Sequence, residues 1–210
     1  MQKTIFFDLD GTLTPQTTWF ELNMKLGITA DEDKELFDRY LKDELLYKDW
    51  TKELIAIHRS RSSITMAEII ELAESINLRP DAVATVLALR EKGYRVVLLS
   101  GSVDVVVGTI ALALGIEDWF ACSTLVFDEN NTLVDIDSIG DEAPAKLKLA
   151  QDYIDAKNID IESCYAVGDG GNDVELFKVM KGIAFGDHKG LNEVAWKKVE
   201  KLSEVVDLID

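Results

Sequence analysis

Short runs of apolar residues recur along the chain, and four of them end in a cluster of polar residues. The runs lie at residues 4–7, 96–99, 164–167 and 182–185. The polar clusters follow at residues 8–12, 100–102, 168–173 and 186–187. Runs of this length, separated by helical patterns, are typical of buried parallel strands. Ligands bind beyond the carboxyl ends of such strands, so we expect the polar clusters to meet at one edge of a sheet.

The stretch from about residue 18 to residue 76 has a helical pattern and no convincing strand. Apolar residues recur there at three- and four-residue intervals, which is typical of amphipathic helices. Thr18 with Glu21, and Thr65 with Glu68, fit the capping box that opens a helix. We therefore predict an all-helical insertion between the first two strands.

The rest of the chain alternates between strand and helix patterns. Helices are predicted at about residues 80–93, 103–114, 144–158, 173–180 and 203–209, the last one capped by Ser203. Residues 125–127 and 133–136, joined through Asn130 and Asn131, fit a hairpin. Such a series predicts an α/β fold with a Rossmann-like, doubly wound parallel sheet.

Composition narrows the class of protein. The 210 residues are 47% apolar and 8% aromatic, enough for a hydrophobic core in one domain with an insertion or in two small domains. The net charge of −17 repels nucleic acid and anionic lipid, so we expect neither nucleic acid nor a membrane as a partner. Two cysteines are too few for a disulfide framework or a zinc site. With no leader-like or membrane-length apolar stretch, we expect a cytoplasmic protein.

Asp8 and Asp10 follow the first strand two positions apart, so their side chains point to the same side. Two carboxylates in that arrangement repel each other unless they share a cation or a proton. An acidic turn without a chemical role also fits the Asp-x-Asp-Gly pattern. The position of this pattern directly after an apolar strand favours a functional site over such a turn.

Asp169 and Asp173 lie in a glycine-rich loop after the third strand. A glycine turn with an Asx cap is the simpler interpretation of that loop. Together with the first pair, however, these residues would gather three or four carboxylates without a His or Cys pair. That donor set favours a hard cation, and Mg²⁺ fits it best.

Two further features would attract a phosphate group to this acidic region. Residues 100–102 are predicted to open a helix, where hydroxyl and N–H groups can cradle a phosphate, although serine is also an ordinary cap. Lys146 would supply the positive charge, and the neighbouring Lys148 is placed on the outer face of the same helix. The structural alternative is a solvated surface lysine, which is the commoner case.

Together the clusters favour phosphoryl transfer. One carboxylate would attack phosphorus, a neighbouring carboxyl group would protonate the leaving oxygen, and a cation with a lysine would screen the charge. Unaided hydrolysis of phosphate monoesters is so slow that enzymes accelerate it by up to about 10²¹-fold. A single carboxylate cannot supply that acceleration, whereas positioning, metal and fixed donors together can.

Four motifs stand in a fixed order: residues 8–12 (Asp-Leu-Asp-Gly-Thr), residues 100–101 (Ser-Gly), Lys146, and residues 168–173 (Gly-Asp-Gly-Gly-Asn-Asp). In this combination they resemble the haloacid dehalogenase (HAD) superfamily of aspartate-nucleophile phosphatases. The hairpin and the last loop are most similar to the phosphoserine phosphatase branch. The resemblance covers essentially the whole chain. It implies a core domain of residues 1–15 and 79–210 and an inserted helical cap domain of residues 16–78.

The resemblance also implies an enzyme that hydrolyses a small phosphorylated metabolite with the help of Mg²⁺. Asp8 would be the nucleophile that forms an aspartyl-phosphate, and Asp10 would be the general acid and then the base. Four residues would hold the metal: Asp8, Asp10 through its carbonyl oxygen, Asp169, and Asp173 through the outer shell. Four residues would bind the phosphate: Ser100, Gly101, Lys146 and Asn172.

One departure from the resemblance concerns the substrate. Phosphoserine phosphatases recognise the serine moiety with a glutamate shortly after the first motif and an arginine in the cap. The glutamate's place falls here on Thr17, with Glu21 one turn later, and the predicted helix at residues 48–57 has no arginine. The sequence therefore does not name the metabolite, and it leaves the oligomeric state and the resting position of the cap open.

Two other functions fit the same clusters. A phosphotransferase or mutase would use the same residues with another acceptor. A non-enzymatic phospho-acceptor also uses strand-end carboxylates, magnesium and a lysine, but its acceptor lies on a middle strand of the chain and it needs no helical insertion. Trp19 and Trp50 are predicted to pack in the cap core, and Trp19 or Phe20 is also a candidate to line the substrate entrance.

Overall fold

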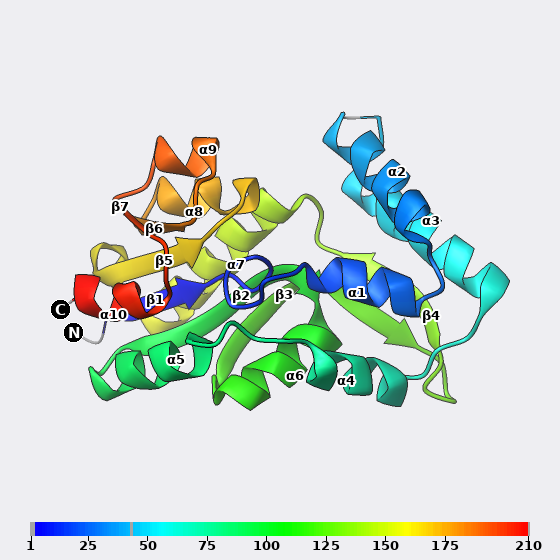
Figure 1. Ribbon diagram of the computed structural model, residues 1–210, viewed down its shortest axis with the longest axis horizontal. Helices are drawn as coiled ribbons and strands as arrows, with labels where there is room; N and C mark the ends of the chain where they lie inside the picture. Colours follow the sequence, from blue (N-terminus) through cyan, green and yellow to red (C-terminus); the bar gives the residue numbers. More distant parts are fainter. Residues whose placement is uncertain (1–2, 43, 210) are drawn as a thin grey trace.

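A seven-stranded sheet forms the centre of the protein, in a computed structural model that describes residues 3–42 and 44–209 (Figure 1). The strands are β1 (Thr4–Phe7), β2 (Arg95–Val103), β3 (Asp118–Phe127), β4 (Leu133–Ser138), β5 (Cys164–Gly168), β6 (Lys181–Phe185) and β7 (Lys197–Val199). Their order is β4-β3-β2-β1-β5-β6-β7. Every neighbouring pair is parallel except the antiparallel β3–β4 pair. The predicted α/β fold and the hairpin are confirmed.

Helices lie in every connection between consecutive strands except the β3–β4 turn. They are α1 (Thr18–Lys25), α2 (Ala30–Leu41), α3 (Tyr47–Arg61), α4 (Met66–Ser75), α5 (Ala82–Glu91), α6 (Asp104–Leu114), α7 (Glu142–Lys157), α8 (Val174–Phe177), α9 (Lys189–Asn192) and α10 (Ser203–Leu208), with short 3-10 turns η1 (Ile161–Ser163) and η2 (Gly171–Asp173). The described residues between β1 and β2 form helices and no named strand. In the described part of the chain, no helix has the length and apolar character needed to span a bilayer.

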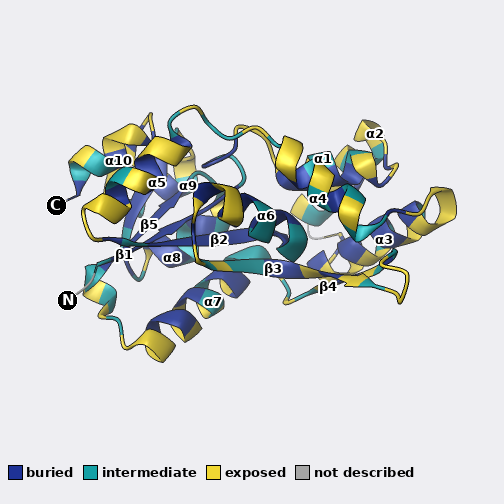
Figure 2. Ribbon diagram, turned by 90° about the horizontal axis from the view of Figure 1, so that it is seen from below, coloured by how far each residue is buried: buried dark blue, intermediate teal, exposed yellow. Residues whose placement is uncertain are grey.

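The central strands β1, β2, β5 and β6 are buried on both faces, as parallel strands of this kind require. Successive side chains of β1 point to opposite faces. Ile5 and Phe7 join one hydrophobic cluster, whereas Phe6 joins a second cluster with Ala150 and Tyr153 of α7. Figure 2 shows the buried strands running between helical layers whose outer surfaces are exposed. This double burial fixes the register of β1 and therefore the position of the residues that follow it.

Helices α1 to α4 lie beyond the carboxyl ends of the central strands and rest on neighbouring elements (Figure 1). Helix α3 packs against β4, and α4 packs against α6. The backbone N–H of Leu133 donates to Ile64 O at 2.9 Å, and that of Met66 donates to Asn131 O at 3.0 Å. The β3–β4 hairpin therefore supports the helices between the first two strands. Whether these helices form a domain with the bounds given above stays a prediction.

The helix caps differ in part from the prediction. The box at Thr65 and Glu68 is confirmed, but the one at Thr18 is wrong, because Thr17 caps α1 and its Oγ1 accepts from Phe20 N at 3.4 Å. Thr18 instead donates hydrogen bonds to a carboxylate of the site described below. Ser203 does not cap α10; its N–H donates to Asp81 Oδ2 at 3.0 Å, so an aspartate distant in sequence takes that place.

The end of one strand, the existence of another and the length of one helix also differ from the prediction. Strand β2 continues through residues 100–102, which were expected to open a helix, because these residues stay buried and β2 pairs with β3 as far as Val103. Strand β7 was missed because Lys197 and Lys198 are exposed and leave no apolar run to recognise. The predicted helix at residues 173–180 is shorter, with η2 before α8.

Candidate active site

The polar clusters meet at the carboxyl edge of the sheet because their strands are neighbours. Strand β1 lies between β2 and β5, with Phe7 opposite both Leu98 and Val167. Asp8 therefore emerges beside the end of β5, where its N–H donates to Val167 O at 2.9 Å. This is the edge at which open α/β sheets bind ligands.

A buried lysine joins two of the carboxylates. Lys146 Nζ lies 2.5 Å from Asp8 Oδ1 and 2.9 Å from Asp173 Oδ1, and its side chain is 0% exposed. Burial lowers the pKa of Lys146, but the charges of Asp173 and Asp8 outweigh burial and raise that pKa above its usual value. Burial raises the pKa of Asp8, assisted by Asp173 and opposed by Lys146. The lysine is therefore a fixed positive charge at the base of the site.

Three carboxylates could share a cation. One oxygen from each of Asp8, Asp169 and Asp173 lies within 4.8 Å of the others. Thr12 Oγ1 donates to Asp169 Oδ1 at 2.6 Å and so orients it. Gly11 has a φ of +82°, and a Cβ there would lie 2.1 Å from Asp169 Oδ2, so both the turn and the close approach require glycine. An all-oxygen donor set of this kind fits Mg²⁺.

Asp10 is held by Thr18, the first residue of α1. The N–H of Thr18 donates to Asp10 Oδ1 at 2.9 Å, and its hydroxyl lies 3.0 Å from Asp10 Oδ2 and 2.6 Å from Ser102 Oγ. Burial raises the pKa of Asp10 to about 7, although the hydrogen bonds from Thr18 oppose the rise. Asp10 can therefore hold a proton near neutral pH.

The predicted phosphate-binding residues lie around the same point. Ser100 is buried and its Oγ accepts from Ser102 N at 3.1 Å. Gly101 and Asn172 line the cleft described below. Lys148, the rejected candidate, is on the outer face, where it pairs with Asp152 at 2.5 Å.

Sequence reasoning missed Glu142, in the first turn of α7. Its Oε2 accepts from Asn172 Nδ2 at 2.7 Å, and its Oε1 lies 3.5 Å from the Tyr47 hydroxyl. A Cβ on Gly101 would lie 2.4 Å from Glu142 Cδ. Its one signal in the sequence was its position four residues before Lys146, which places both side chains on the same side of a helix.

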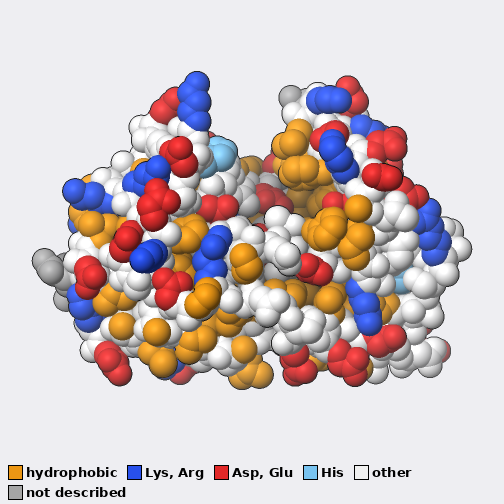
Figure 3. Space-filling model, viewed as in Figure 1, with side chains coloured by type: hydrophobic (Ala, Val, Ile, Leu, Met, Phe, Trp, Pro, Cys, Tyr) orange, Lys and Arg blue, Asp and Glu red, His pale blue; other side chains and the backbone are white. Residues whose placement is uncertain are grey.

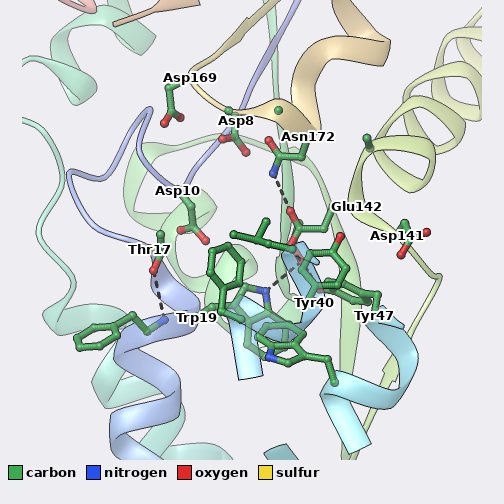
Figure 4. A pocket seen from close by; sticks show the side chains of 18 of the residues that line it. Asp8, Asp10, Thr17, Trp19, Tyr40, Tyr47, Asp141, Glu142, Asp169 and Asn172 are labelled. Carbon is green, nitrogen blue, oxygen red and sulfur yellow. Dashed lines mark hydrogen bonds between the residues drawn. The ribbon is translucent and has the colours of Figure 1, made fainter. Parts of the chain in front are cut away.

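A cleft of about 650 Å³ opens above these residues. Figure 3 shows the hollow between two raised parts of the surface, with acidic side chains deep inside and hydrophobic side chains on its right-hand wall. In Figure 4, Asp8, Asp10, Asp169 and Asn172 lie at one end, and Trp19, Tyr40 and Tyr47 lie at the other. Of the predicted site residues, Asp8, Asp10, Gly101, Asp169 and Asn172 line the cleft, and Ser100, Lys146 and Asp173 are buried. Asp187, from the fourth polar cluster, pairs with Lys198 at 2.8 Å and does not line the cleft.

Comparison with known proteins identifies the family of the chain. The model of the haloacid dehalogenase-like hydrolase family matches residues 5–178. A phosphoserine phosphatase of Methanocaldococcus jannaschii is 25% identical, with the match covering 84% of this chain and 82% of the relative. A phosphoserine phosphatase of Archaeoglobus fulgidus is 28% identical, and the match covers 95% of this chain but 57% of the relative.

A solved structure described as a phospho-aspartyl intermediate analogue of phosphoserine phosphatase is also similar. It is 26% identical with a TM-score of 0.81, and the match covers 100% of this chain and 99% of that structure. Since the family model spans most of the 210 residues, the chain belongs to the haloacid dehalogenase-like hydrolases.

Proposed function

We propose that the protein is a Mg²⁺-dependent phosphomonoester hydrolase that acts on a small phosphorylated metabolite and uses Asp8 as its nucleophile. The observation that carries the proposal is the position of Asp8 at the end of β1, in contact with Lys146 and close to Asp169 and Asp173. The phosphoserine phosphatases among its relatives support the reaction type. Helices α1 to α4 would form the cap that covers the substrate.

The reaction has two steps. In the first, a carboxylate oxygen of Asp8 forms a bond to phosphorus while the bond to the leaving oxygen breaks, and Asp10 donates its proton to that oxygen. In the second, Asp10 takes a proton from water, which attacks phosphorus and releases inorganic phosphate together with the Asp8 carboxylate. The hydrogen bonds from Thr18 keep Asp10 in place through both steps.

The chain's own donors would hold the phosphate group during the transfer. Lys146 offers a buried positive charge beside Asp8, and Asn172 offers its amide from the loop after β5. Ser100 and the N–H of Gly101 complete the set. When bound to Asp8, the Asp10 carbonyl oxygen and Asp169, with Asp173 behind them, Mg²⁺ would neutralise the charge that the acidic cluster and the phosphate share.

The test is hydrolysis of 4-nitrophenyl phosphate by the full chain with Mg²⁺. Asp8→Asn removes the nucleophile, so kcat should fall by about 10⁴-fold or more, and excess chelator should abolish turnover in the wild type. The matched control is Asp187→Asn, an aspartate at the end of β6 that pairs with Lys198 outside the cleft. It should keep its activity.

Other outcomes would replace the proposal. Undiminished turnover by Asp8→Asn would rule out the nucleophile. Stable phosphorylation without turnover would identify a phospho-acceptor, and transfer of phosphate to an added alcohol in preference to water would identify a phosphotransferase.

A further inference from the structure

Six aromatic side chains line the cleft, and Figure 4 shows three of them, Trp19, Tyr40 and Tyr47, at the end away from Asp8. This aromatic wall comes from α1, α2 and α3 and consists of Trp19, Phe20, Phe37, Tyr40, Tyr47 and Trp50. Its rings contact one another in series: Trp19 and Trp50 have centroids 4.9 Å apart, Trp50 and Tyr47 5.3 Å, and Tyr47 and Tyr40 5.8 Å. Phe20 and Phe37, at 39% and 46% exposure, present the most accessible surface.

The charges near this wall are negative. Asp33, Asp141 and Glu142 line the same cleft, in addition to the aspartates near Lys146. Among the lining residues that the structure describes, there is no lysine or arginine. Two arginines of α2 and α3 are engaged elsewhere, Arg39 with Glu53 at 2.8 Å and Arg61 with Glu32 at 2.5 Å. A carboxylate on the substrate would therefore meet no lysine or arginine at this end, and Nδ1 of His188, the histidine that lines the cleft, already accepts from Leu191 N at 3.3 Å.

Glu142 lies at the junction of the two ends. It contacts Asn172 on the phosphate side and Tyr47 on the aromatic side. Figure 4 shows its carboxylate between Asn172 and the ring of Tyr47. A leaving group that extends from a phosphate near Asp8 toward the wall would pass this carboxylate.

We propose that the cleft selects phosphomonoesters whose leaving group carries an alkylammonium cation, with the aromatic wall and Glu142 recognising the positive charge. Aromatic faces attract ammonium groups through the ring quadrupole, and alkylated ammonium groups add apolar surface that the rings cover. A carboxylate beside the rings strengthens the attraction because it adds a charge of opposite sign. This inference rests on the proposed phosphatase function and defines its substrate class.

The decisive experiment compares three phosphate esters that differ in the leaving group. They are 2-(trimethylammonio)ethyl phosphate, its neutral isostere 3,3-dimethylbutyl phosphate, and O-phosphoserine, each measured as kcat/KM with the Mg²⁺-loaded full chain. We expect the trimethylammonio ester to exceed the neutral isostere by about tenfold or more. Phosphoserine should be a poorer substrate than the trimethylammonio ester, because its carboxylate would meet no lysine or arginine. Equal values for the first two esters, or a preference for phosphoserine, would overturn the inference.

Two variants test which side chains recognise the positive charge of the leaving group. Glu142→Gln keeps the size of the side chain and removes its charge, and Phe37→Leu keeps an apolar side chain and removes the ring. Each should lower the ratio of kcat/KM between the trimethylammonio ester and its isostere, by about tenfold and about threefold respectively. The control is Glu162→Gln, an exposed glutamate in η1 outside the cleft. An unchanged ratio in both cleft variants would contradict the inference.

Turnover of 4-nitrophenyl phosphate separates this inference from the function on which it rests. If the wild type hydrolyses that ester but shows no preference for the ammonium compound, the substrate class is wrong and the phosphatase stands. If it hydrolyses none of the four esters, the phosphatase proposal itself fails.

Discussion

The two ends of the cleft are built from different parts of the chain. The phosphate end consists of residues that follow β1 and β5 and residues within β2, together with Lys146 of α7, and the sheet fixes their relative positions. The leaving-group end consists of side chains on α1, α2 and α3, which rest on the β3–β4 hairpin and on α4. Under the proposed function, catalysis would thus depend on the topology of the sheet, whereas selectivity would depend on which side chains the helices present.

The two ends also differ in how charge is balanced. At the phosphate end, buried carboxylates surround one buried ammonium group, an arrangement in which removal of the cation leaves uncompensated charge. At the leaving-group end, the largely buried rings of Trp19, Tyr47 and Trp50 line the cleft, with carboxylates beside them. Changes at the first end should therefore affect the rate of every substrate, and changes at the second should affect the choice among substrates.

The largest effect in this comparison should come from Lys146→Met. It removes the buried ammonium group that contacts Asp8 and Asp173, so kcat for 4-nitrophenyl phosphate should fall by about 10²- to 10³-fold. Lys148→Met is the matched control, because Lys148 is exposed and pairs with Asp152 on the outer face of the same helix. Circular dichroism checks that both variants fold. A comparable loss in Lys148→Met would show that the two lysines had been assigned the wrong way round.

A smaller effect should come from the contact that joins the two ends. Gly101→Ala would place a Cβ 2.4 Å from Glu142 Cδ and 2.6 Å from Glu142 Oε2, so Glu142 must move from its present position beside Asn172. We expect kcat/KM to fall in the single variant and to recover in part in Gly101→Ala/Glu142→Ala. The interaction energy in the double-mutant cycle should lie between about 0.5 and 3 kcal/mol. If the double variant is no better than the single one, Glu142 does not cause the effect.

The sequence predicted the phosphate end much better than the leaving-group end. Asp8 and Asp169 could be found because each follows a buried strand, and neighbouring parallel strands deliver their carboxyl ends to one edge. Glu142 could not be found in this way, since its importance depends on contacts with Asn172 and Tyr47, which are 30 and 95 positions away in the sequence. The aromatic wall was anticipated at Trp19 and Phe20, but helical periodicity alone does not tell which rings face a cleft.

The predicted ends of helices and strands were wrong where tertiary contacts override the local preference of the sequence. Thr18 fits a capping box, yet its N–H and hydroxyl bind Asp10 and leave Thr17 to cap α1. Ser102 fits a helix start, yet pairing of β2 with β3 keeps it in the strand. Both differences between prediction and structure lie beside Asp10, so tertiary contacts outweigh the local sequence signals at the site itself.

The smallest predicted effect concerns an exposed ion pair within the helices of the leaving-group end. Arg61 of α3 makes two hydrogen bonds to the Glu32 carboxylate of α2, at 2.7 and 2.5 Å. The bond to Arg61 is the largest cause that lowers the pKa of Glu32 from 4.5 to about 2, with further bonds from Thr29. A depressed carboxyl pKa stabilises the fold above the ordinary value, and this contribution is lost as pH falls toward the folded value.

The difference in thermal midpoint between wild type and Arg61→Ala should therefore be small but constant above about pH 4.5, and it should shrink as pH falls toward 2. Arg59→Ala is the control, because Arg59 contacts the carbonyl oxygen of Val134, at 3.5 Å, and any effect of its removal should not follow the titration of Glu32. Turnover of 4-nitrophenyl phosphate at neutral pH should be almost the same in both variants, since neither arginine lines the cleft. A large loss of turnover in Arg61→Ala would mean that the phosphate end depends on how α2 and α3 are held together, and the separation of the two ends would then fail.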